Sequence, residues 1–381
     1  MTQINHTRRF HLRGSVLWRD YPNLMGMFQS GDFYLHDGVI SKTAKPGSYE
    51  EITGYAIPGL VDVHAHIGLA KEGAVGPEQQ REQALADRDA GTLLIRDCGS
   101  PADTKWLDDE PGMPRILRCG RHLTRPKRYI RGYGLELENP ADLPAEVVRQ
   151  TAAGGGWIKL VGDWIDRADG ADSDLRPVWQ TDVLCDAVAA AHEAGARVTM
   201  HIFGSEAIDG ALEAGVDCIE HGIGMRPDQV QEASRRGIAV TPTFLQLERF
   251  PDFAAQAGSK YPRYADTMMG LHEGRVEHQA SLAAAGVQLL PGTDSGGYQH
   301  HGSLPTELAR WTEMGMTPSQ VLDLATWKAR DFLRIESLWE GAPADLVLYA
   351  DDPRIDLGVL QHPAGVWVRG ALVSGSLCHA S

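Results

Sequence analysis

The feature that most constrains the fold of this chain is a repeated junction between a helix-like stretch and a short apolar stretch. Five times an alanine-containing run with helical character ends at a glycine, and an apolar run follows at once, as in AHEAGARVTMHI. A helix commonly ends on a residue in the left-handed conformation, which glycine adopts at little cost. We therefore expect left-handed backbone at the five helix-ending glycines, Gly91, Gly195, Gly215, Gly237 and Gly286.

Helix followed by strand at this spacing predicts parallel β/α units. Three further apolar segments, at 58–67, 114–120 and 156–162, bring the number of predicted strands to eight. Eight strands fit a TIM-type (β/α)8 barrel, although a doubly wound sheet shares the same local pattern. The two ends of the chain differ, because they consist of short alternating runs broken by turn residues. We predict an α/β protein with the barrel over residues 57–337 and a small discontinuous β-sandwich domain from 1–56 and 338–381.

The composition limits the classes of molecule that the protein is expected to bind. Its 36 Lys and Arg residues against 51 Asp and Glu residues give a net charge of −15, which disfavours nucleic acid or an anionic membrane as partner. The first residues lack an apolar run, no stretch has the roughly 20 apolar residues of a membrane span, and the cysteines are scattered. These features predict a cytoplasmic protein that acts on a small-molecule substrate, and they leave a homo-oligomer open.

Residues that bind metals stand where four of the predicted strands end. The first strand ends in HAH, and because alternate residues of a strand share a face, His64 and His66 point the same way. His201, His221 and Asp294 end the fifth, sixth and eighth strands. Barrel enzymes hold their working residues at these carboxyl ends. Imidazoles with a carboxylate suit a divalent metal such as zinc, so we predict a metal site here.

Lys159 lies inside the fourth predicted strand, on the same face as Trp157 and Val161. A lysine facing the barrel interior is favoured as the neutral amine, which can take up carbon dioxide to give a carbamate that bridges two metals. The alternatives are a lysine that reaches past the strand end into solvent and a Schiff-base lysine. Glu220 precedes His221, so we expect it on the opposite face as a structural hydrogen-bond partner.

The ordered motifs IPGLVDVHAHIG, ALEAGVDCIEHG, PGTDSG, GMTPSQVLDLATWKAR and GAPADLVLY resemble those of the amidohydrolase superfamily, in its imidazolonepropionase-related and metal-dependent prolidase-like branch. The resemblance implies two divalent metal ions, expected to be zinc, with an N-carboxylated Lys159 shared between them. The implied ligands are His64, His66 and Asp294 for one metal, and His201 and His221 for the other.

This resemblance implies a hydrolase of a C–N bond of the amide or peptide-like kind. A hydroxide that bridges the metals would attack the carbonyl, and Asp294 would carry the proton to the leaving nitrogen. The expected substrate is a prolidase-like dipeptide or an N-acyl amino acid. The alternatives are a single-metal cyclic-amide hydrolase or deaminase, which has no use for a bridging lysine, and a non-catalytic scaffold of the same lineage.

A basic segment indicates where the substrate binds. Residues 115–131 contain seven Lys or Arg and no Asp or Glu, and they lead into a loop on the predicted metal face. Arginine pairs with carboxylates through two parallel hydrogen bonds, so this loop predicts a substrate that carries a carboxylate. A solvated or subunit-contacting loop is the alternative. The predicted substrate-binding residues are Arg125, Arg128, Arg131, Tyr133, His300 and His301.

Two segments depart from the prolidase-like pattern. They are LVGDWID, which includes the end of the fourth predicted strand, and GRHLTRPKRYIRGYG, which follows the third. Both are expected to shape the substrate pocket, so the resemblance carries over better for the metal ligands than for the substrate.

Overall fold

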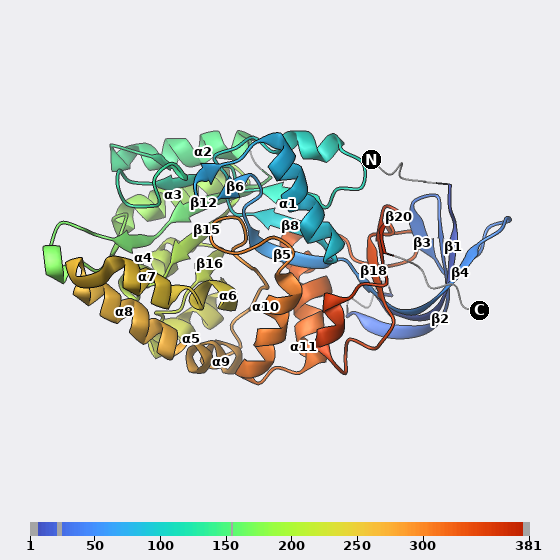
Figure 1. The fold of residues 1–381 in the computed structure, drawn as a ribbon. Helices are drawn as coiled ribbons and strands as arrows, with labels where there is room; N and C mark the ends of the chain where they lie inside the picture. Colours follow the sequence, from blue (N-terminus) through green and yellow to red (C-terminus); the bar gives the residue numbers. More distant parts are fainter. Residues whose placement is uncertain (1–6, 21–24, 154, 376–381) are drawn as a thin grey trace.

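The structure of the protein is a computed structural model that describes residues 7–20, 25–153 and 155–375. Parallel strands form the centre of its larger part, with helices outside them (Figure 1). One sheet has the order β5-β8-β9 and another the order β11-β10-β12-β15-β16-β17. The bounds of these strands are β5 Leu60–Ala65, β8 Thr92–Asp97, β9 Arg115–Arg118, β10 His122–Thr124, β11 Gly134–Glu136, β12 Trp157–Val161, β15 Arg197–Ile202, β16 Cys218–His221 and β17 Ala239–Thr241.

The two parallel sheets are connected at both ends. Strands β9 and β10 follow each other within residues 115–124. On the other side, Val240 of β17 bridges Leu289, and Ser295 bridges Ala65 of β5, both in parallel. These contacts lead from β17 through residues 289–295 back to β5, so the parallel strands follow one another around a ring.

The helices end where the sequence pattern indicates. The five predicted glycines all have left-handed backbone, with φ values of 92°, 80°, 74°, 68° and 72° in chain order, so this prediction is confirmed. They follow α1 Pro77–Asp89, α3 Thr181–Glu193, α4 Glu206–Ala214, α5 Pro227–Arg236 and α9 Arg275–Ala284. The other α-helices are α2 Leu143–Ala153, α6 Phe244–Leu247, α7 Phe250–Ala257, α8 Pro262–Glu273, α10 Leu304–Arg310, α11 Pro318–Asp323 and α12 Ala329–Leu333.

Helices α3 and α4 pack on the ring through an apolar face. Helix α4, for example, buries Ala207, Ile208, Ala211 and Leu212. These side chains recur at a spacing of three to four residues, as expected for a helix that covers a sheet. Within the described part of the chain, no helix combines the length and the apolar character that crossing a membrane requires.

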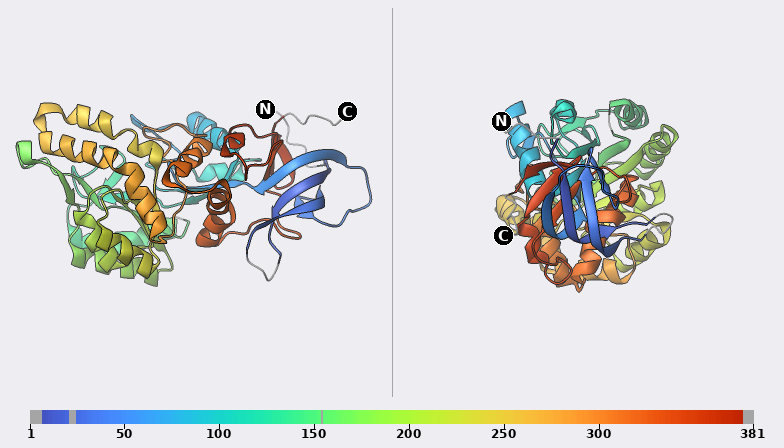
Figure 2. Two further views of the ribbon diagram at one scale, coloured as in Figure 1. Left: turned by 90° about the horizontal axis from the view of Figure 1, so that it is seen from below. Right: turned by 90° about the vertical axis from the view of Figure 1, so that its right-hand side faces the viewer.

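Both ends of the chain contribute to one further sheet (Figure 2). Its order is β20-β19-β18-β4-β1-β2-β3, so the expected sandwich is one hydrogen-bonded sheet of seven strands among the described residues. Phe10, Trp18, Phe33 and Trp367 are buried in its apolar core. The bounds are β1 Phe10–Trp18, β2 Met27–His36, β3 Val39–Ser41, β4 Glu50–Pro58, β18 Leu346–Tyr349, β19 Gly365–Val368 and β20 Ala371–Ser374.

The short hairpins lie near the carboxyl ends of the ring strands. They are β6 Leu69–Ala70 with β7 Gly73–Ala74, and β13 Asp163–Ile165 with β14 Leu175–Pro177. The second hairpin follows β12 directly, so it carries the residues just beyond Lys159 toward the same end of the ring.

Candidate metal centre

Six predicted ligands converge at the carboxyl ends of the ring strands. The Nε2 atoms of His66 and His64 lie 3.0 and 3.2 Å from Asp294 Oδ1. Lys159 Nζ lies 3.5 Å from His64 Nε2, and His221 Nε2 lies 3.1 Å from His201 Nδ1. The structure therefore brings together His64, His66, Lys159, His201, His221 and Asp294.

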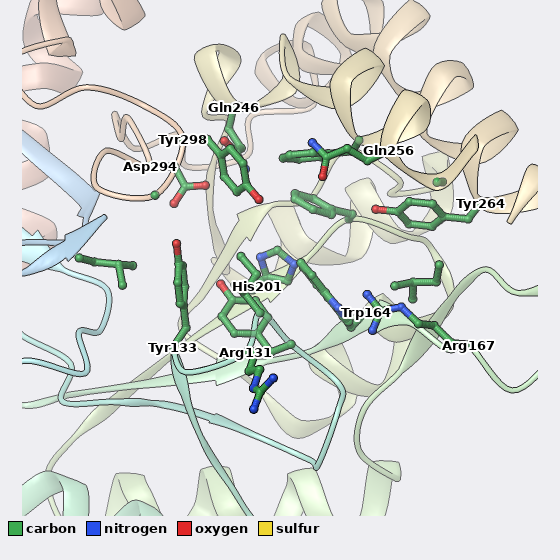
Figure 3. Close-up of a pocket in the computed structure, with 18 of the residues that line it drawn as sticks. Arg131, Tyr133, Trp164, Arg167, His201, Gln246, Gln256, Tyr264, Asp294 and Tyr298 are labelled. Atoms are coloured by element: carbon green, nitrogen blue, oxygen red, sulfur yellow. The ribbon is translucent and has the colours of Figure 1, made fainter. Parts of the chain in front are cut away.

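Burial separates Asp294 from the other five residues. Lys159 is fully buried, and the four histidines are at most 4% exposed. The Asp294 side chain is 15% exposed, and it lines the cavity together with His66 and His201 (Figure 3). Asp294 is thus the carboxylate of the cluster that solvent or a small molecule can reach.

The groups behind three of the histidines fix which ring nitrogen faces the cluster. His66 Nδ1 donates to the carbonyl oxygen of Gly99 at 2.7 Å. Thr243 Oγ1 donates to the Pro242 carbonyl, so it accepts from His221 Nδ1 at 2.7 Å. A protonated Nδ1 leaves the Nε2 lone pair free, which is the form in which imidazole binds a metal.

His64 is held by a buried carboxylate. Its Nδ1 lies 2.8 Å from Glu220 Oε2, and Glu220 is also bonded to Arg96 and Thr199. Burial raises the pKa of Glu220, but the charges of Arg96 and His64 outweigh it and hold the pKa well below its usual range. Glu220 is therefore an ionised carboxylate that faces His64 Nδ1 at ion-pair distance.

The position of Glu220 corrects the expectation that it faces away from His221. Both side chains are buried inside the ring, because His221 has a left-handed backbone with φ 71° that interrupts the strand alternation. Thr243 at φ 50° and Asp294 at φ 57° share this uncommon conformation. Three strained residues at one site are typical of a functional centre, since the surrounding structure must hold them in place.

The donor set fits a divalent metal. Ligand atoms of His64, His66 and Asp294 lie within 4.8 Å of one another. Burial lowers the pKa of His201 well below its usual value, so this imidazole is neutral. His201 Nε2 is buried and has no hydrogen-bond partner among the described residues. Neutral imidazoles grouped with a carboxylate suit zinc and similar ions.

Lys159 has an unusual environment for an ammonium group. Among the described residues, no carboxylate oxygen lies within 4.0 Å of its Nζ, and its nearest polar neighbour is an imidazole nitrogen. A fully buried cation without an anionic partner is costly. This position therefore fits a lysine whose charge is removed or reversed.

A cavity of about 420 Å³ opens over this cluster. Two predicted substrate-binding residues, Arg131 and Tyr133, line it, and the Tyr133 hydroxyl donates to the Ala70 carbonyl at 2.8 Å. The further lining residues are Leu69, Tyr129, Ile130, Trp164, Ile165, Arg167, Phe203, Gln246, Phe253, Gln256, Ala257, Tyr261, Tyr264, Gly297 and Tyr298.

The structure does not bring the other four predicted substrate contacts to the cavity wall. Arg128 pairs with Asp166 at 2.9 Å and donates to the backbone, which fastens the loop after β10 to the β13–β14 hairpin. Arg125 donates to the Glu138 carbonyl at 3.2 Å. His301 Nδ1 lies 2.8 Å from Asp87 Oδ2, and His300 is exposed outside the lining. Asp166 and Asp87 are distant in sequence from the residues that they bind, so the sequence pattern did not indicate these pairs.

Sequence reasoning missed two parts of the site. His122 is fully buried and stacks on His66 with ring centroids 5.0 Å apart, and neither of its ring nitrogens has a partner among the residues that the structure describes. Extending the third predicted strand to residue 124 would have placed it at a strand end. Trp164 lines the cavity from LVGDWID, one of the two segments that depart from the prolidase-like pattern, and Arg167 lines it from the position just after that segment.

Metal-ligating residues at the carboxyl ends of parallel strands, grouped beside one cavity, are typical of barrel enzymes. The chain belongs to the amidohydrolase family, whose model matches residues 55–375. An uncharacterized protein of Mycobacterium tuberculosis (strain ATCC 25618 / H37Rv) is 47% identical to it over 363 residues, which is 95% of each chain. Ochratoxinase of Aspergillus niger is 27% identical over 193 residues, or 47% of this chain and 38% of that enzyme.

Solved structures share the fold over almost the whole chain. A Xaa-Pro dipeptidase with bound methionine matches with a TM-score of 0.80 at 22% identity, covering 96% of this chain and all of the other. The crystal structure of A. niger ochratoxinase matches with a TM-score of 0.78 at 18% identity, covering 98% and 97%. At these identities the likeness concerns the fold.

Proposed function

We propose that this protein is a metal-dependent hydrolase that cleaves a C–N bond of an amide or peptide-like substrate carrying a carboxylate. The observation that carries the proposal is the convergence of four histidines, a buried lysine and one partly exposed aspartate beside a cavity. Relatives described as a Xaa-Pro dipeptidase and an ochratoxinase support a dipeptide or an N-acyl amino acid as the substrate class.

In this proposal the protein holds two divalent metals, with zinc as the expected ion. His64, His66 and Asp294 would hold one, and His201 and His221 the other. When bound, such metals lower the pKa of a water molecule and polarise a carbonyl oxygen. The Lys159 amine would add carbon dioxide and release one proton, and the resulting carbamate would offer an oxygen ligand to each metal. In the described part of the chain no carboxylate lies within 4.0 Å of Nζ, which supports this assignment because the carbamate would supply the missing negative charge.

Asp294 has the role of proton carrier. Burial raises its pKa, but the charge of His64 and the hydrogen bonds from His64 and His66 outweigh it and hold the pKa well below the usual range. The carboxylate is thus ionised and able to take the proton of the attacking water. It then delivers that proton to the leaving nitrogen, which departs as a neutral amine.

The two arginines that line the cavity are the candidates for binding the substrate carboxylate. Neither Arg131 nor Arg167 makes an ion pair within the described part of the chain, and the only carboxylate in the lining is Asp294. A free guanidinium can bind a carboxylate through two parallel hydrogen bonds. The binding residue would then be one that sequence reasoning predicted, Arg131, or one that it missed, Arg167.

The test is a panel of dipeptides and N-acyl amino acids, each paired with its C-terminal amide, on zinc-loaded enzyme. We expect hydrolysis that chelation abolishes, with kcat/KM at least tenfold higher for the acids. Arg131→Ala or Arg167→Ala should remove this difference, whereas Arg235→Ala, on the surface of α5, should keep it. Equal turnover of acids and amides contradicts the carboxylate, and no turnover with both metals bound contradicts the hydrolase.

A further inference from the structure

The cavity is much richer in aromatic side chains than the chain as a whole. Aromatic residues make up 7% of the sequence. They supply eight of the twenty residues that line the cavity, namely Tyr129, Tyr133, Trp164, Phe203, Phe253, Tyr261, Tyr264 and Tyr298. Ligand sites are commonly apolar, but aliphatic side chains would serve equally well for a merely apolar ligand. The choice of rings therefore points to a ligand that itself carries a ring.

Two of the ring contacts lie in the lining of this cavity, and Trp164 of one and Tyr298 of the other lie on different sides of it (Figure 3). Tyr129 and Trp164 meet edge to face with ring centroids 4.9 Å apart, beside His201. Phe253 of α7 and Tyr298, which follows Asp294, meet in the same way at 5.2 Å. Edge-to-face pairs hold their rings at a fixed angle, so each wall presents a rigid aromatic surface to a ligand between them.

Buried polar atoms without partners lie in the same walls. Trp164 Nε1 and Gln246 Oε1 are both buried, and neither has a hydrogen-bond partner among the described residues. An unpaired donor and an unpaired acceptor in one cavity are costly unless a ligand supplies the complementary groups. A secondary amide carries both, since its carbonyl accepts and its N–H donates. An amide on a tertiary nitrogen, as in a bond to proline, has no N–H to offer.

Arg167 provides a positive charge at the end of the cavity away from Asp294. Arg167 lies beside Tyr264 and away from Asp294 in Figure 3. The Tyr264 hydroxyl points into the cavity, and both residues belong to its lining. A ligand that reaches from Asp294 to Arg167 must pass Trp164, so its middle part is the part that the rings contact.

We propose that the substrate is a secondary amide of an aromatic amino acid or aromatic carboxylic acid, with its ring between the Tyr129–Trp164 and Phe253–Tyr298 pairs. This inference rests on the proposed function of the same site and specifies its substrate class. The ring of Trp164 selects the aromatic group, and the Trp164 indole N–H binds an oxygen of the substrate. Trp164 is thus a specificity-determining residue.

The test separates binding from turnover. Titration calorimetry on zinc-loaded enzyme compares 3-phenylpropanoate with 3-cyclohexylpropanoate, which has the same carboxylate and a ring of similar size without π electrons. We expect about tenfold tighter binding of the phenyl acid, as ring–ring contacts of this kind provide. Trp164→Leu should abolish the preference, and Trp164→Phe should keep it while weakening both acids. Trp339→Leu, a ring on the surface, is the matched control and should change neither affinity.

Equal binding of the two acids, or a preference that persists in Trp164→Leu, overturns the inference. Turnover of N-acetylphenylalanine and N-acetylcyclohexylalanine is then measured on the same preparations. A phenyl preference in binding without any turnover contradicts the proposed function and leaves the ligand class standing. Equal binding together with equal turnover contradicts the aromatic specificity and leaves the hydrolase standing.

Discussion

At the scale of single residues, the site depends on what lies behind each ligand. Gly99, Thr243 and Glu220 each contact the Nδ1 atom of one histidine and turn its Nε2 toward the cluster. The ligands themselves are residue types that a strand pattern can reveal. The groups that contact them are the Gly99 carbonyl, the Thr243 hydroxyl and the Glu220 carboxylate. Nothing in the sequence pattern distinguishes these three residues from others of the same type.

A conservative substitution tests the proposed role of Asp294 as the proton carrier. Asp294→Asn keeps an oxygen that can bind a metal but removes the base, so kcat should fall by about 10²- to 10⁴-fold with a smaller change in KM. Steady-state kinetics on variant and parent at matched metal content measure the effect. Turnover close to that of the parent would exclude Asp294 as the proton carrier.

Glu220 should act on metal affinity through His64. Glu220→Gln leaves His64 Nδ1 without its anionic partner, so the affinity for zinc should fall by about 10- to 100-fold. The variant also leaves the buried Arg96 charge without its anionic partner, which destabilises the fold. The double variant Arg96→Met, Glu220→Gln should recover stability in denaturant unfolding while its zinc affinity stays low. Recovery of both would show that Glu220 is a structural residue only.

At the scale of elements, helix ends and strand ends carry most of the predictable information. Left-handed glycines follow from local backbone geometry, and the sequence indicated them correctly at all five positions. The predicted ligands at strand ends follow from the strand pattern in the same way. The loops over the site depend on distant partners instead. Asp166 holds Arg128 from 38 residues away, and Asp87 holds His301 from 214 residues away. Propensity and periodicity contain no signal for such pairs.

The glycine argument predicts a stability difference between two alanine substitutions. Gly237 ends α5 at φ 68° with open space around it, so Gly237→Ala should cost about 1 kcal/mol from backbone conformation alone. Gly274 joins α8 to α9 at φ −82°, where Gly274→Ala should be neutral or slightly stabilising. Denaturant unfolding of both variants checks this. Equal effects would mean that backbone conformation does not set the cost at Gly237.

Glu307 gives the fold a predictable pH dependence. It fastens α10 to the first turn of α6 by accepting from the Phe244 and Leu245 amides, each at 2.9 Å. Burial raises its pKa from 4.5 to about 7, so the folded state holds this proton more tightly than the unfolded chain does. Its contribution is full below about pH 4.5 and is lost as the pH rises through about 7, by up to roughly 3 kcal/mol.

The Glu307→Gln variant tests this dependence because it has no proton to lose. The free energy of unfolding of the parent minus that of the variant should decrease from pH 5 to pH 8. A difference that is flat or increases over this range would contradict the raised pKa.

At the scale of the whole molecule, the chain ends and the ring are directly joined. One residue, Gly59, separates β4 of the terminal sheet from β5 of the ring, and Arg330 donates to its carbonyl at 2.8 Å. His64 and His66 lie on or just after β5, so the first two predicted ligands follow this junction by a few residues. The order of the motifs along the chain therefore reflects the path of the strands, which is why an ordered motif set predicted the fold.

The central claim is that Lys159 completes a site for two metals. The most direct measurement is the metal content per chain, by elemental analysis after dialysis against zinc, of the parent and of Lys159→Ala. We predict two zinc ions per chain in the parent and at most one in the variant, with the fold of the variant verified by circular dichroism. One zinc ion in the parent, or two in a folded variant, would contradict the claim.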